Sequence, residues 1–450
     1  MENHSIYSIS PIDGRYHTYT QSLKNYFSEF ALFKYRLMIE VEYLIYLKKI
    51  GLPELQNFPS DTSFLKNIYN SFSFSDCIQI KNIESTINHD VKAVEYFFSQ
   101  QLQKNNLSNY KSFIHFGLTS QDINNNSITL SIKNCIEDVI IPLLQNILSD
   151  LLEKSSDWIH YKMLSHTHGQ PAVPTTMGKE IMVFHYRISK QLQLLKNIDY
   201  YGKLGGASGN LNAHYAAYPD YNWEKLMEQF LSQFSLKRNK YTTQIDNYEN
   251  LSLIFDNLKR INTIFIDMNK DIWQYISMNY ITQKFNKAEV GSSTMPHKIN
   301  PINFENSEGN LLLANSLLNF MSEKLPVSRL QRDLTDSTVL RSVGSIFGYM
   351  LIAYQNFKKG LNKLEVNHEQ LKKDLNTNCV VIIEGIQTIL RKHGIHNAYE
   401  LCKDLTRNNK CITMDDITVF IKNLDIDEKI KKNLYEVNIE NYIGNAEKTF

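Results

Sequence analysis

The chain has 450 residues, which exceeds one typical hydrophobic core, so two or three domains are expected. Its 48 basic and 47 acidic residues leave a net charge of +1, which excludes a whole-protein attraction to nucleic acid or anionic membranes but leaves local patches possible. With 17 glycines and 10 prolines, helix breakers make up roughly half of their usual share of about 12%. Together with 42% hydrophobic residues, this scarcity favours long helices.

Segments typical of membrane insertion or secretion are not expected. No apolar run reaches about 18 residues, and residues 1–4 start no secretory signal. The five cysteines are scattered, without the close pairs that bind metals. We therefore expect reduced thiols in a cytoplasmic protein.

Residues 1–111 are predicted to form a small helical first domain. Its turn-rich start carries Arg15 and Tyr16, and the apolar pattern of residues 22–50 is that of a buried helix. After a loop with two prolines, two more helical stretches follow, and the second holds the polar run Asn88-His89-Asp90.

Residues 112–360 are predicted to form a central domain of long helices. It opens with a glycine-led polar turn at residues 116–122, which carries Thr119 and Ser120 into a helix. Farther along this helix, apolar residues recur at spacings of three and four, which defines one helical face, and Pro142 is the expected kink.

Two polar breaks follow, at residues 166–171 and 202–212, with an amphipathic helix between them. The clearest periodicity of the chain lies between Leu251 and Tyr275, where apolar residues alternate spacings of three and four over more than three heptads. Sustained heptads indicate a bundle seam, and a second apolar set on the same run indicates a helix covered on several faces. Oligomerisation is therefore a hypothesis before any family is considered. Residues 361–450 are more charged and are predicted to form a third small helical domain.

The stretch of residues 291–301, GSSTMPHKINP, is built unlike its helical surroundings. Gly291 gives the backbone freedom, and the two prolines push their preceding residues away from helix. The stretch is predicted to be a polar loop that presents Ser292, Lys298 and Asn300 to an anionic group. An ordinary connector between helices is the alternative, because Ser, Gly and Pro dominate turns.

The polar motifs fall mostly at helix interruptions, where several can converge into a cleft. They supply hydroxyls, imidazoles, amides and cations but few carboxylates, which suits an anionic substrate and proton transfer more than hydrolysis. His168 lies in a polar break and is a candidate general acid or base. Two alternatives stay open: a metal pair formed with His166, which is a weak signal without nearby carboxylates, and a histidine that caps the next helix.

Arginines crowd residues 328–341, where Arg329, Arg332 and Arg341 accompany Ser337 and Thr338. Guanidinium and hydroxyl donors together suit a phosphate monoester. Two aspartates in the same run, Asp333 and Asp336, allow the alternative of a salt-bridged helix end.

The string GSSTMPHKINPINFENSEGN resembles the signature loop of the fumarase/aspartase superfamily, and its residues are most similar to those of the bacterial purine-biosynthesis branch. Similar blocks run from residues 10–16 to residues 441–444, so the resemblance covers essentially the whole chain. It implies an all-α fold of three helical domains, whose central bundle forms the core of a homotetramer with active sites shared by several subunits. It implies no metal and no organic cofactor.

The implied reaction is β-elimination of fumarate from adenylosuccinate, giving AMP, and from the succinyl-carboxamide ribotide SAICAR, giving AICAR. Ser292 matches the superfamily's general base, and His168, in THGQPA, is the expected general acid. A serine is a poor base at its ordinary pKa, so the site must stabilise an alkoxide, and Lys298 is a plausible cation for this or for the substrate carboxylate. Asn300 is expected to donate to a carboxylate, a role that can coexist with a turn before Pro301.

The family pattern carries further positions over as substrate contacts. His89 is expected to be one of them, with a buried helix histidine as the alternative. Ser208 departs from the pattern, because the family usually has a branched apolar residue there, and this leaves the local packing open. The substrate contacts that the resemblance implies are Arg15, Tyr16, Asn88, His89, Asp90, Thr119, Ser120, Gln244, Lys298, Asn300, Arg332, Ser337, Thr338 and Arg341.

Two other readings of the chain remain. Within the superfamily, argininosuccinate lyase and fumarase act on substrates without phosphate. From another class, a non-catalytic helical scaffold would keep the fold without turnover, although the set of Ser292, Lys298, Asn300 and His168 argues against it.

Overall fold

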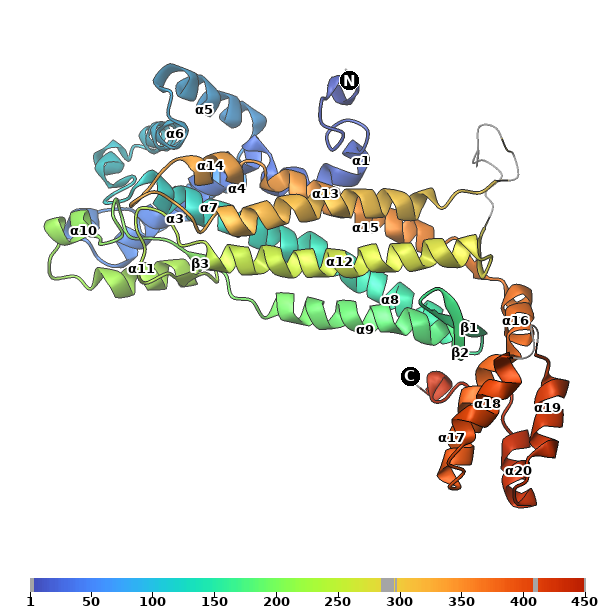
Figure 1. Cartoon of the computed structure of the whole chain (residues 1–450). Coiled ribbons are helices and arrows are strands. Elements are labelled where there is room, and N and C mark those ends of the chain that lie inside the picture. Colours follow the sequence, from blue (N-terminus) through green and yellow to red (C-terminus); the bar gives the residue numbers. More distant parts are fainter. Residues whose placement is uncertain (1–3, 285–294, 296–297, 408–411, 449–450) are drawn as a thin grey trace. The chain divides into compact units, whose positions relative to one another are not determined.

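The computed structural model describes residues 4–284, 295, 298–407 and 412–448, and most of them are helical (Figure 1). The strands that it describes form three separate two-stranded pairs, β1 with β2, β3 with β4 and β5 with β6. The predicted all-α fold is confirmed. Within these ranges, no helix is long and apolar enough to cross a membrane.

The chain divides into two compact units, each assembled from three stretches of sequence. Unit 1 consists of Met1–Leu144, Gln191–Thr263 and Ser307–Gln355, and unit 2 consists of Gln145–Lys190, Ile264–Asn306 and Asn356–Phe450. The three domains expected from the sequence, with boundaries at residues 111/112 and 360/361, stay a prediction.

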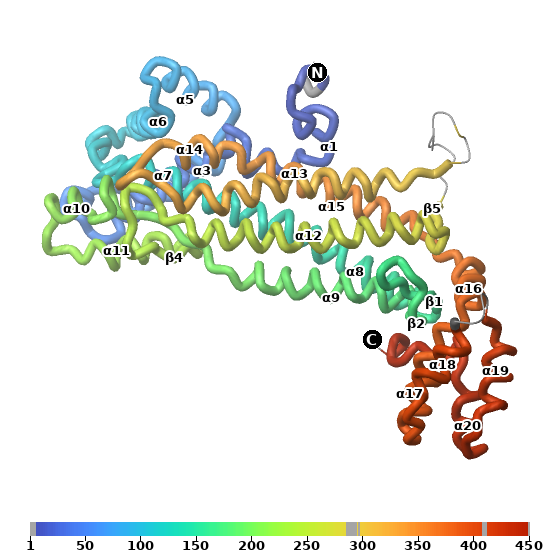
Figure 2. Tube along the Cα trace, viewed as in Figure 1, coloured from blue at the N-terminus to red at the C-terminus, as the bar shows by residue number. Residues whose placement is uncertain are grey.

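Five long helices have residues in both units, and Figure 2 traces their course along the chain. They are α8 (Ile141–Asp157), α9 (Met177–Lys196), α12 (Glu249–Ser277), α13 (Ile302–Lys324) and α15 (Val343–Leu361).

The other elements of unit 1 are mostly short or medium helices. They are η1 (His4–Tyr7), α1 (His17–Thr20), η2 (Gln21–Leu23), α2 (Lys24–Phe27), α3 (Glu29–Lys49), η3 (Pro53–Leu55), α4 (Ser63–Asn70), α5 (Phe74–Ile87), α6 (Asp90–Lys104), η4 (Ser108–Phe113), α7 (Ser120–Cys135), η5 (Ile136–Ile140), β3 (Tyr201–Gly202), α10 (Asn212–Ala217), α11 (Trp223–Ser232), β4 (Lys237–Arg238) and α14 (Thr335–Leu340).

Unit 2 holds the remaining strands and the C-terminal helices. They are β1 (Lys162–Thr167), β2 (Gln170–Thr176), β5 (Ile281–Gln283), β6 (Leu364–Val366), α16 (His368–Thr377), η6 (Cys379–Ile382), α17 (Ile383–Lys392), α18 (Ala398–Arg407), α19 (Met414–Asn423), α20 (Glu428–Tyr435) and η7 (Ala446–Lys448).

The heptad pattern of residues 251–275 lies on α12, as predicted. Its apolar residues are buried from Leu251 to Ile272, and Phe255 and Ile266 of the second apolar set are buried as well. Trp273 of that second set is 42% exposed. The helix is therefore covered on more than one face over most of its length.

The helix is irregular just before Pro142, the residue at which the sequence predicts a kink. A single π-helical turn, η5, separates α7 from α8, and Pro142 is the second residue of α8. Because η5 passes into α8 without a gap, Pro142 lies inside a continuous helical run, and its missing N–H falls next to the π-helical turn that already interrupts the regular hydrogen-bond pattern.

The polar break at residues 166–171 is a β-hairpin turn. Strands β1 and β2 pair antiparallel with Thr167 opposite Gln170, which leaves His168 and Gly169 as the two central residues. Both have positive φ, 52° and 72°, as a type I′ turn requires. The next helix, α9, begins at Met177, where the hydroxyl of Thr176 accepts a hydrogen bond from the Lys179 N–H at 3.2 Å, so His168 does not cap it.

The start of α7 is fixed by a buried ion pair within unit 1. The Asp122 carboxylate accepts a hydrogen bond from Nζ of Lys203 at 2.7 Å, and both side chains are 0% exposed. It also accepts from the backbone N–H groups of Thr119, at 2.8 Å, Gly205, at 2.8 Å, and Gly206, at 3.0 Å. The T-x-x-D pattern therefore sets the helix start and joins it to the glycine-rich break.

The glycine-rich break needs glycine for a steric reason. Gly209 has a φ of +86°, and a Cβ atom there would lie 2.1 Å from the carbonyl oxygen of Thr242. Ser208, the departure from the family pattern, is half-buried, and its hydroxyl donates to Oδ1 of Asn212 at 3.0 Å. A polar residue is thus accommodated at position 208 by a hydrogen bond.

Replacement of Lys203 by methionine is expected to destabilise the protein by about 3–5 kcal/mol, because one partner of a fully buried ion pair is removed. The matched control is Lys133→Met on α7, which breaks the pair of the half-buried Lys133 with Glu137 (2.9 Å) and is expected to cost less than about 1 kcal/mol, because the exposed Glu137 carboxylate stays in contact with water. Urea unfolding of the two variants beside the parent measures both effects. Equal stability of the two variants would contradict the role given to Lys203.

Candidate active site

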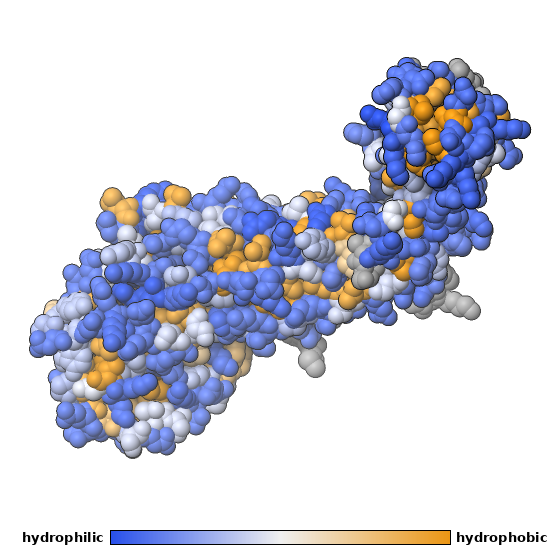
Figure 3. Space-filling model, turned by 90° about the horizontal axis from the view of Figure 1, so that it is seen from below, coloured by the Kyte–Doolittle hydropathy of each residue, from blue (hydrophilic) through white to orange (hydrophobic). Residues whose placement is uncertain are grey.

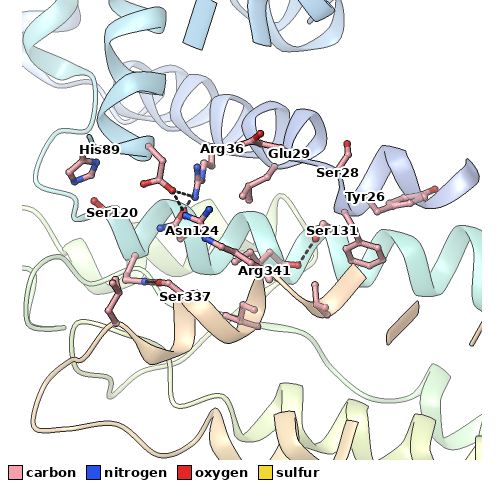
Figure 4. Close-up of a pocket in the computed structure, with 18 of the residues that line it drawn as sticks. Tyr26, Ser28, Glu29, Arg36, His89, Ser120, Asn124, Ser131, Ser337 and Arg341 are labelled. Carbon is pink, nitrogen blue, oxygen red and sulfur yellow. Dashed lines mark hydrogen bonds and ion pairs between the residues drawn. The ribbon is translucent and has the colours of Figure 1, made fainter. Parts of the chain in front are cut away.

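A cavity of about 430 Å³ lies within unit 1, between α2, α3, the start of α6, α7 and the segment that carries α14. Figure 4 shows His89 and Ser120 at one end, Tyr26 and Ser131 at the other, and Arg36, Asn124 and Arg341 between them. Seven of the substrate contacts expected from the sequence line this cavity: Asn88, His89, Asp90, Ser120, Arg332, Ser337 and Arg341. These seven residues come from three separate parts of the chain, and the lining from α2 and α3 adds a fourth.

The corner between α5 and α6 presents His89 to the cavity. Asn88 ends α5 in the left-handed conformation, with a φ of 53°, and His89 caps α6 by accepting a hydrogen bond from the Lys92 N–H at Nδ1, 3.1 Å away. Because Nδ1 accepts, the neutral ring carries its proton on Nε2. His89 is exposed, so the alternative of a buried helix histidine does not apply.

Asp90 is shared by two arginines. Its Oδ2 accepts from Nη2 of Arg36 at 2.7 Å and from Nη2 of Arg341 at 3.2 Å. Burial by itself raises the pKa of Asp90, but the charge and hydrogen bond of Arg36, together with the Val91 N–H and Arg341, more than offset it, so the pKa lies below its usual value. The Asp90 carboxylate is therefore ionised at neutral pH.

Ser337 lies on α14 and lines the cavity. Its hydroxyl accepts a hydrogen bond from Nε2 of Gln121 at 3.1 Å, and Gln121 is 1% exposed. Asp336, the preceding residue, is buried and accepts from the hydroxyl of Tyr248 at 2.9 Å. Burial, and then Asp336, raise the pKa of Tyr248 well above its ordinary value, so this donor keeps its proton. These two bonds fix the helix that carries Ser337.

The two arginines that are three residues apart have different surroundings. Arg332 lines the cavity, and its Nη1 donates to Oε1 of Gln244 at 3.1 Å. Arg329 lies on an exposed surface, with a side chain 79% exposed that pairs with Asp333 at 3.1 Å. The salt-bridged alternative therefore applies to Arg329, whereas Arg332 faces the cavity.

Five other predicted contacts of unit 1 do not line the cavity. Gln244 uses both ends of its amide, since Oε1 accepts from Arg332 and Nε2 donates to the carbonyl of Ala207 at 3.0 Å. Thr338 is exposed and donates to the Leu334 carbonyl at 3.4 Å. The remaining three are Arg15 and Tyr16, which precede α1, and Thr119, which precedes α7.

The predicted catalytic groups belong to unit 2. His168 is exposed at the tip of the β1–β2 hairpin, and Lys298 is exposed in the segment before α13, where Asn300 is half-buried. Ser292 lies outside the described residues. None of the described members of this set lines the unit 1 cavity.

Sequence reasoning missed Arg36, Gln121 and Asn124, which also line the cavity. Arg36 lies in the apolar run of α3 and is 3% exposed, so a cation inside a buried helical pattern was the available signal. Asn124 lies four residues after Ser120 on α7 and shares its helical face, and Gln121 lies three residues before Asn124, next to that face. Among the described residues, no cluster of three or more His, Cys, Asp or Glu side chains has a geometry that could hold a metal ion.

A second buried ion pair lies just ahead of α7. Nδ1 of His115 is 2.6 Å from Oε1 of Glu40, whose side chain is 0% exposed. Burial lowers the pKa of His115, but Glu40, by charge and hydrogen bond, outweighs this effect and raises the pKa above its usual value. The pair holds the turn that leads to Thr119 and Ser120.

Two protein-family models match most of the chain. A family model described as "Lyase" matches residues 14–314, and one described as "Adenylosuccinate lyase C-terminal" matches residues 328–443. The adenylosuccinate lyase of Dictyostelium discoideum is 50% identical over 450 residues, which cover 97% of this chain and 96% of that protein. The one of Buchnera aphidicola from Acyrthosiphon pisum is 48% identical over 451 residues, 99% and 98% of the two chains.

A solved structure of a lyase shares the fold. A fumarate lyase from Mesorhizobium superimposes with a TM-score of 0.74 at 15% identity, covering 95% of this chain and 96% of that one. The fold and the family match therefore define an enzyme of the helical lyase class. Within that class, the chain belongs to the adenylosuccinate lyase family.

The stabilising contribution of His115 is expected to depend on pH. Its pKa in the folded protein lies above the value of about 6.5 in an unfolded chain, so the contribution is complete below about pH 6.5 and is lost as the pH rises through the folded pKa. The difference in free energy of unfolding between the parent and His115→Gln should therefore be largest near pH 6 and shrink toward pH 9.

The control variant is His160→Gln, which removes a histidine whose side chain is 82% exposed and lies 3.6 Å from Glu447, and it is expected to change the free energy of unfolding by less than about 1 kcal/mol at each of these pH values. Unfolding curves at several pH values measure both. A constant difference across this range for His115→Gln would contradict the assignment.

Proposed function

We propose that the protein cleaves adenylosuccinate to AMP and fumarate and SAICAR to AICAR and fumarate. The observation that carries this proposal is the cavity of unit 1, where Arg332, Arg341 and Ser337 meet beside His89 in a chain of the adenylosuccinate lyase family. Both substrates carry a phosphate monoester, which guanidinium and hydroxyl donors bind well.

The phosphate is proposed to lie between α7 and the α14 segment. Arg332 and Arg341 supply positive charge, and the hydroxyls of Ser120 and Ser337 supply neutral donors. Nε2–H of His89, at the same end of the cavity as Ser120, is available to a further oxygen of the substrate. Substrates without phosphate, as in argininosuccinate lyase and fumarase, would bring no phosphate anion to these cations.

The proposed chemistry is a β-elimination. Ser292, as the general base, takes the proton from Cβ of the succinyl group, and the resulting carbanion is stabilised as an aci-carboxylate. The C–N bond then breaks, the electron pair of the carbanion becomes the C=C bond of fumarate, and His168 gives a proton to the departing nitrogen. Lys298 and Asn300 are proposed to bind the substrate carboxylate and to lower the cost of charge on Ser292.

The remaining predicted contacts belong to the same proposal. Arg15 and Tyr16 near the N-terminus, Thr119 and Thr338 are proposed to complete the surroundings of the substrate. Gln244 would contribute through the orientation of Arg332, to which it is bonded.

The active enzyme is proposed to be a cytoplasmic homotetramer with sites shared by several subunits. Hydrophobic side chains are exposed on helices of the bundle, among them Leu253, Leu312, Leu313 and Phe320, each about half exposed. Figure 3 shows hydrophobic patches on one face of the chain among hydrophilic residues. Exposed apolar surface of this kind favours association with further copies of the chain.

Turnover is the first test of the function. Purified protein supplied with adenylosuccinate is expected to release fumarate, followed by its absorbance. Ser292→Ala and His168→Ala are each expected to lower kcat about 100- to 10,000-fold, the range of general acid–base catalysis. A folded parent without turnover would refute the proposed substrate, and near-normal turnover of either variant would refute the role of that residue.

The phosphate assignment is tested by a pair of neighbouring arginines. Arg332→Ala is expected to raise KM for adenylosuccinate at least about tenfold, because a charge-assisted hydrogen bond to phosphate is lost. Arg329→Ala removes an equal charge three residues away, from an exposed surface pair, and is expected to change KM less than about twofold. Equal effects of the two changes would indicate general electrostatics in place of a phosphate contact.

A further inference from the structure

Arg36 has no part in the chemistry described so far, yet it is the most deeply buried cation of the cavity wall. Its side chain is 4% exposed, whereas that of Arg341 is 61% exposed. Burial of a guanidinium is costly, and it lowers the pKa of Arg36 despite the opposing charge of Asp90. A guanidinium that is buried on an apolar helix needs specific ion-pair and hydrogen-bond partners to offset the loss of hydration.

The partners of Arg36 hold it in one orientation. Nε donates to Oδ1 of Asn124 and Nη2 donates to Oδ2 of Asp90, both at 2.7 Å, as the dashed lines of Figure 4 indicate. The same Oδ2 atom of Asp90 accepts the longer, 3.2 Å bond from Arg341. One carboxylate oxygen is therefore shared by a fixed, buried arginine and by an exposed arginine with room to move.

We propose that Arg36 is a positioning residue that makes Arg341 releasable for the substrate phosphate. In the cavity without ligand, Asp90 holds Arg341 near its place of use. When a phosphate monoester arrives, Arg341 exchanges the Asp90 carboxylate for phosphate, and Arg36 keeps Asp90 neutralised. This inference rests on the proposed function, because it assigns Arg341 to the phosphate.

The charges of the cluster explain why Arg36 is needed. Arg36, Asp90 and Arg341 together carry a net charge of +1, which attracts a phosphate. Without Arg36, Asp90 and Arg341 would neutralise each other, and phosphate would have to break an ion pair that no other cation replaces. Removal of the Asp90 charge as well would restore the net charge and free Arg341.

The test is a cycle of variants measured by calorimetric titration with AMP and with adenosine, which lacks the phosphate. Arg36→Met is expected to weaken AMP binding about tenfold or more and to leave adenosine binding unchanged within about twofold. The double variant Arg36→Met/Asp90→Asn is expected to bind AMP at least about threefold more tightly than Arg36→Met, because the net charge of the cluster is restored. Arg36→Lys, which keeps the charge, should lie between the parent and Arg36→Met.

The outcomes separate this inference from the proposed function. A parent that binds AMP no better than adenosine would refute the phosphate site and the inference with it. A parent that prefers AMP, combined with a double variant as weak as Arg36→Met, would refute the inference alone, since Arg36 would then contact the phosphate itself or Asp90 the substrate. Equal loss of AMP and adenosine binding in Arg36→Met would also refute it, as a purely structural effect.

Folding of Arg36→Met is checked by its thermal unfolding, because it leaves a partly buried carboxylate with one exposed partner. If this variant does not fold, the double variant decides alone, since it leaves no buried charge of the cluster unpaired. AMP affinity clearly above that of Arg341→Ala supports the inference, and a loss as large as that of Arg341→Ala overturns it.

Discussion

The buried pair of Asp122 and Lys203 is the constraint on which the cavity depends. Two fully buried charges are tolerable only when each is paired and hydrogen-bonded, and Asp122 satisfies this with Lys203 and three backbone N–H groups. The same carboxylate thus fixes the start of α7, where Ser120 and Gln121 lie, and the glycine-rich turn after Lys203. From that turn, the carbonyl of Ala207 holds Gln244, and Gln244 holds Arg332. A single ion pair therefore supports two parts of the cavity wall, the start of α7 and, through Gln244, the Arg332 side chain.

The electrostatics of the cavity follow from unequal burial of like charges. Arg36 and Arg341 share one oxygen of Asp90, but only Arg36 is enclosed by its helix. A buried guanidinium is held by geometry and desolvation, whereas an exposed one can exchange partners at little cost. The asymmetry gives the wall a fixed ion pair and a mobile cation, which is a suitable arrangement for an anionic ligand that must be bound and then released.

Local backbone geometry supports the positions of two histidines. His89 is held at the start of α6 by its own hydrogen bond to the Lys92 N–H, which also sets the tautomer of the neutral ring. His168 takes a positive φ at a two-residue hairpin turn, a conformation that the sequence alone left as a polar break. Both imidazoles are exposed, so neither is part of the packed core of its own unit. An exposed histidine held by its backbone suits proton transfer or substrate contact better than a core position would.

The sequence by itself determined the helical class, the family and the residue types available for chemistry, because apolar spacing, scarce helix breakers and motif strings are local properties. It also identified seven residues of the cavity from motifs. Only the tertiary structure decided which polar residues meet. Arg329 and Arg332 have similar local sequence, but packing turns one to the surface and the other to the cavity. Arg36 looked like part of an apolar helix until Asp90 and Asn124, 54 and 88 residues away in the chain, were brought to it. Contacts between residues so far apart depend on how the helices pack, which no local pattern encodes.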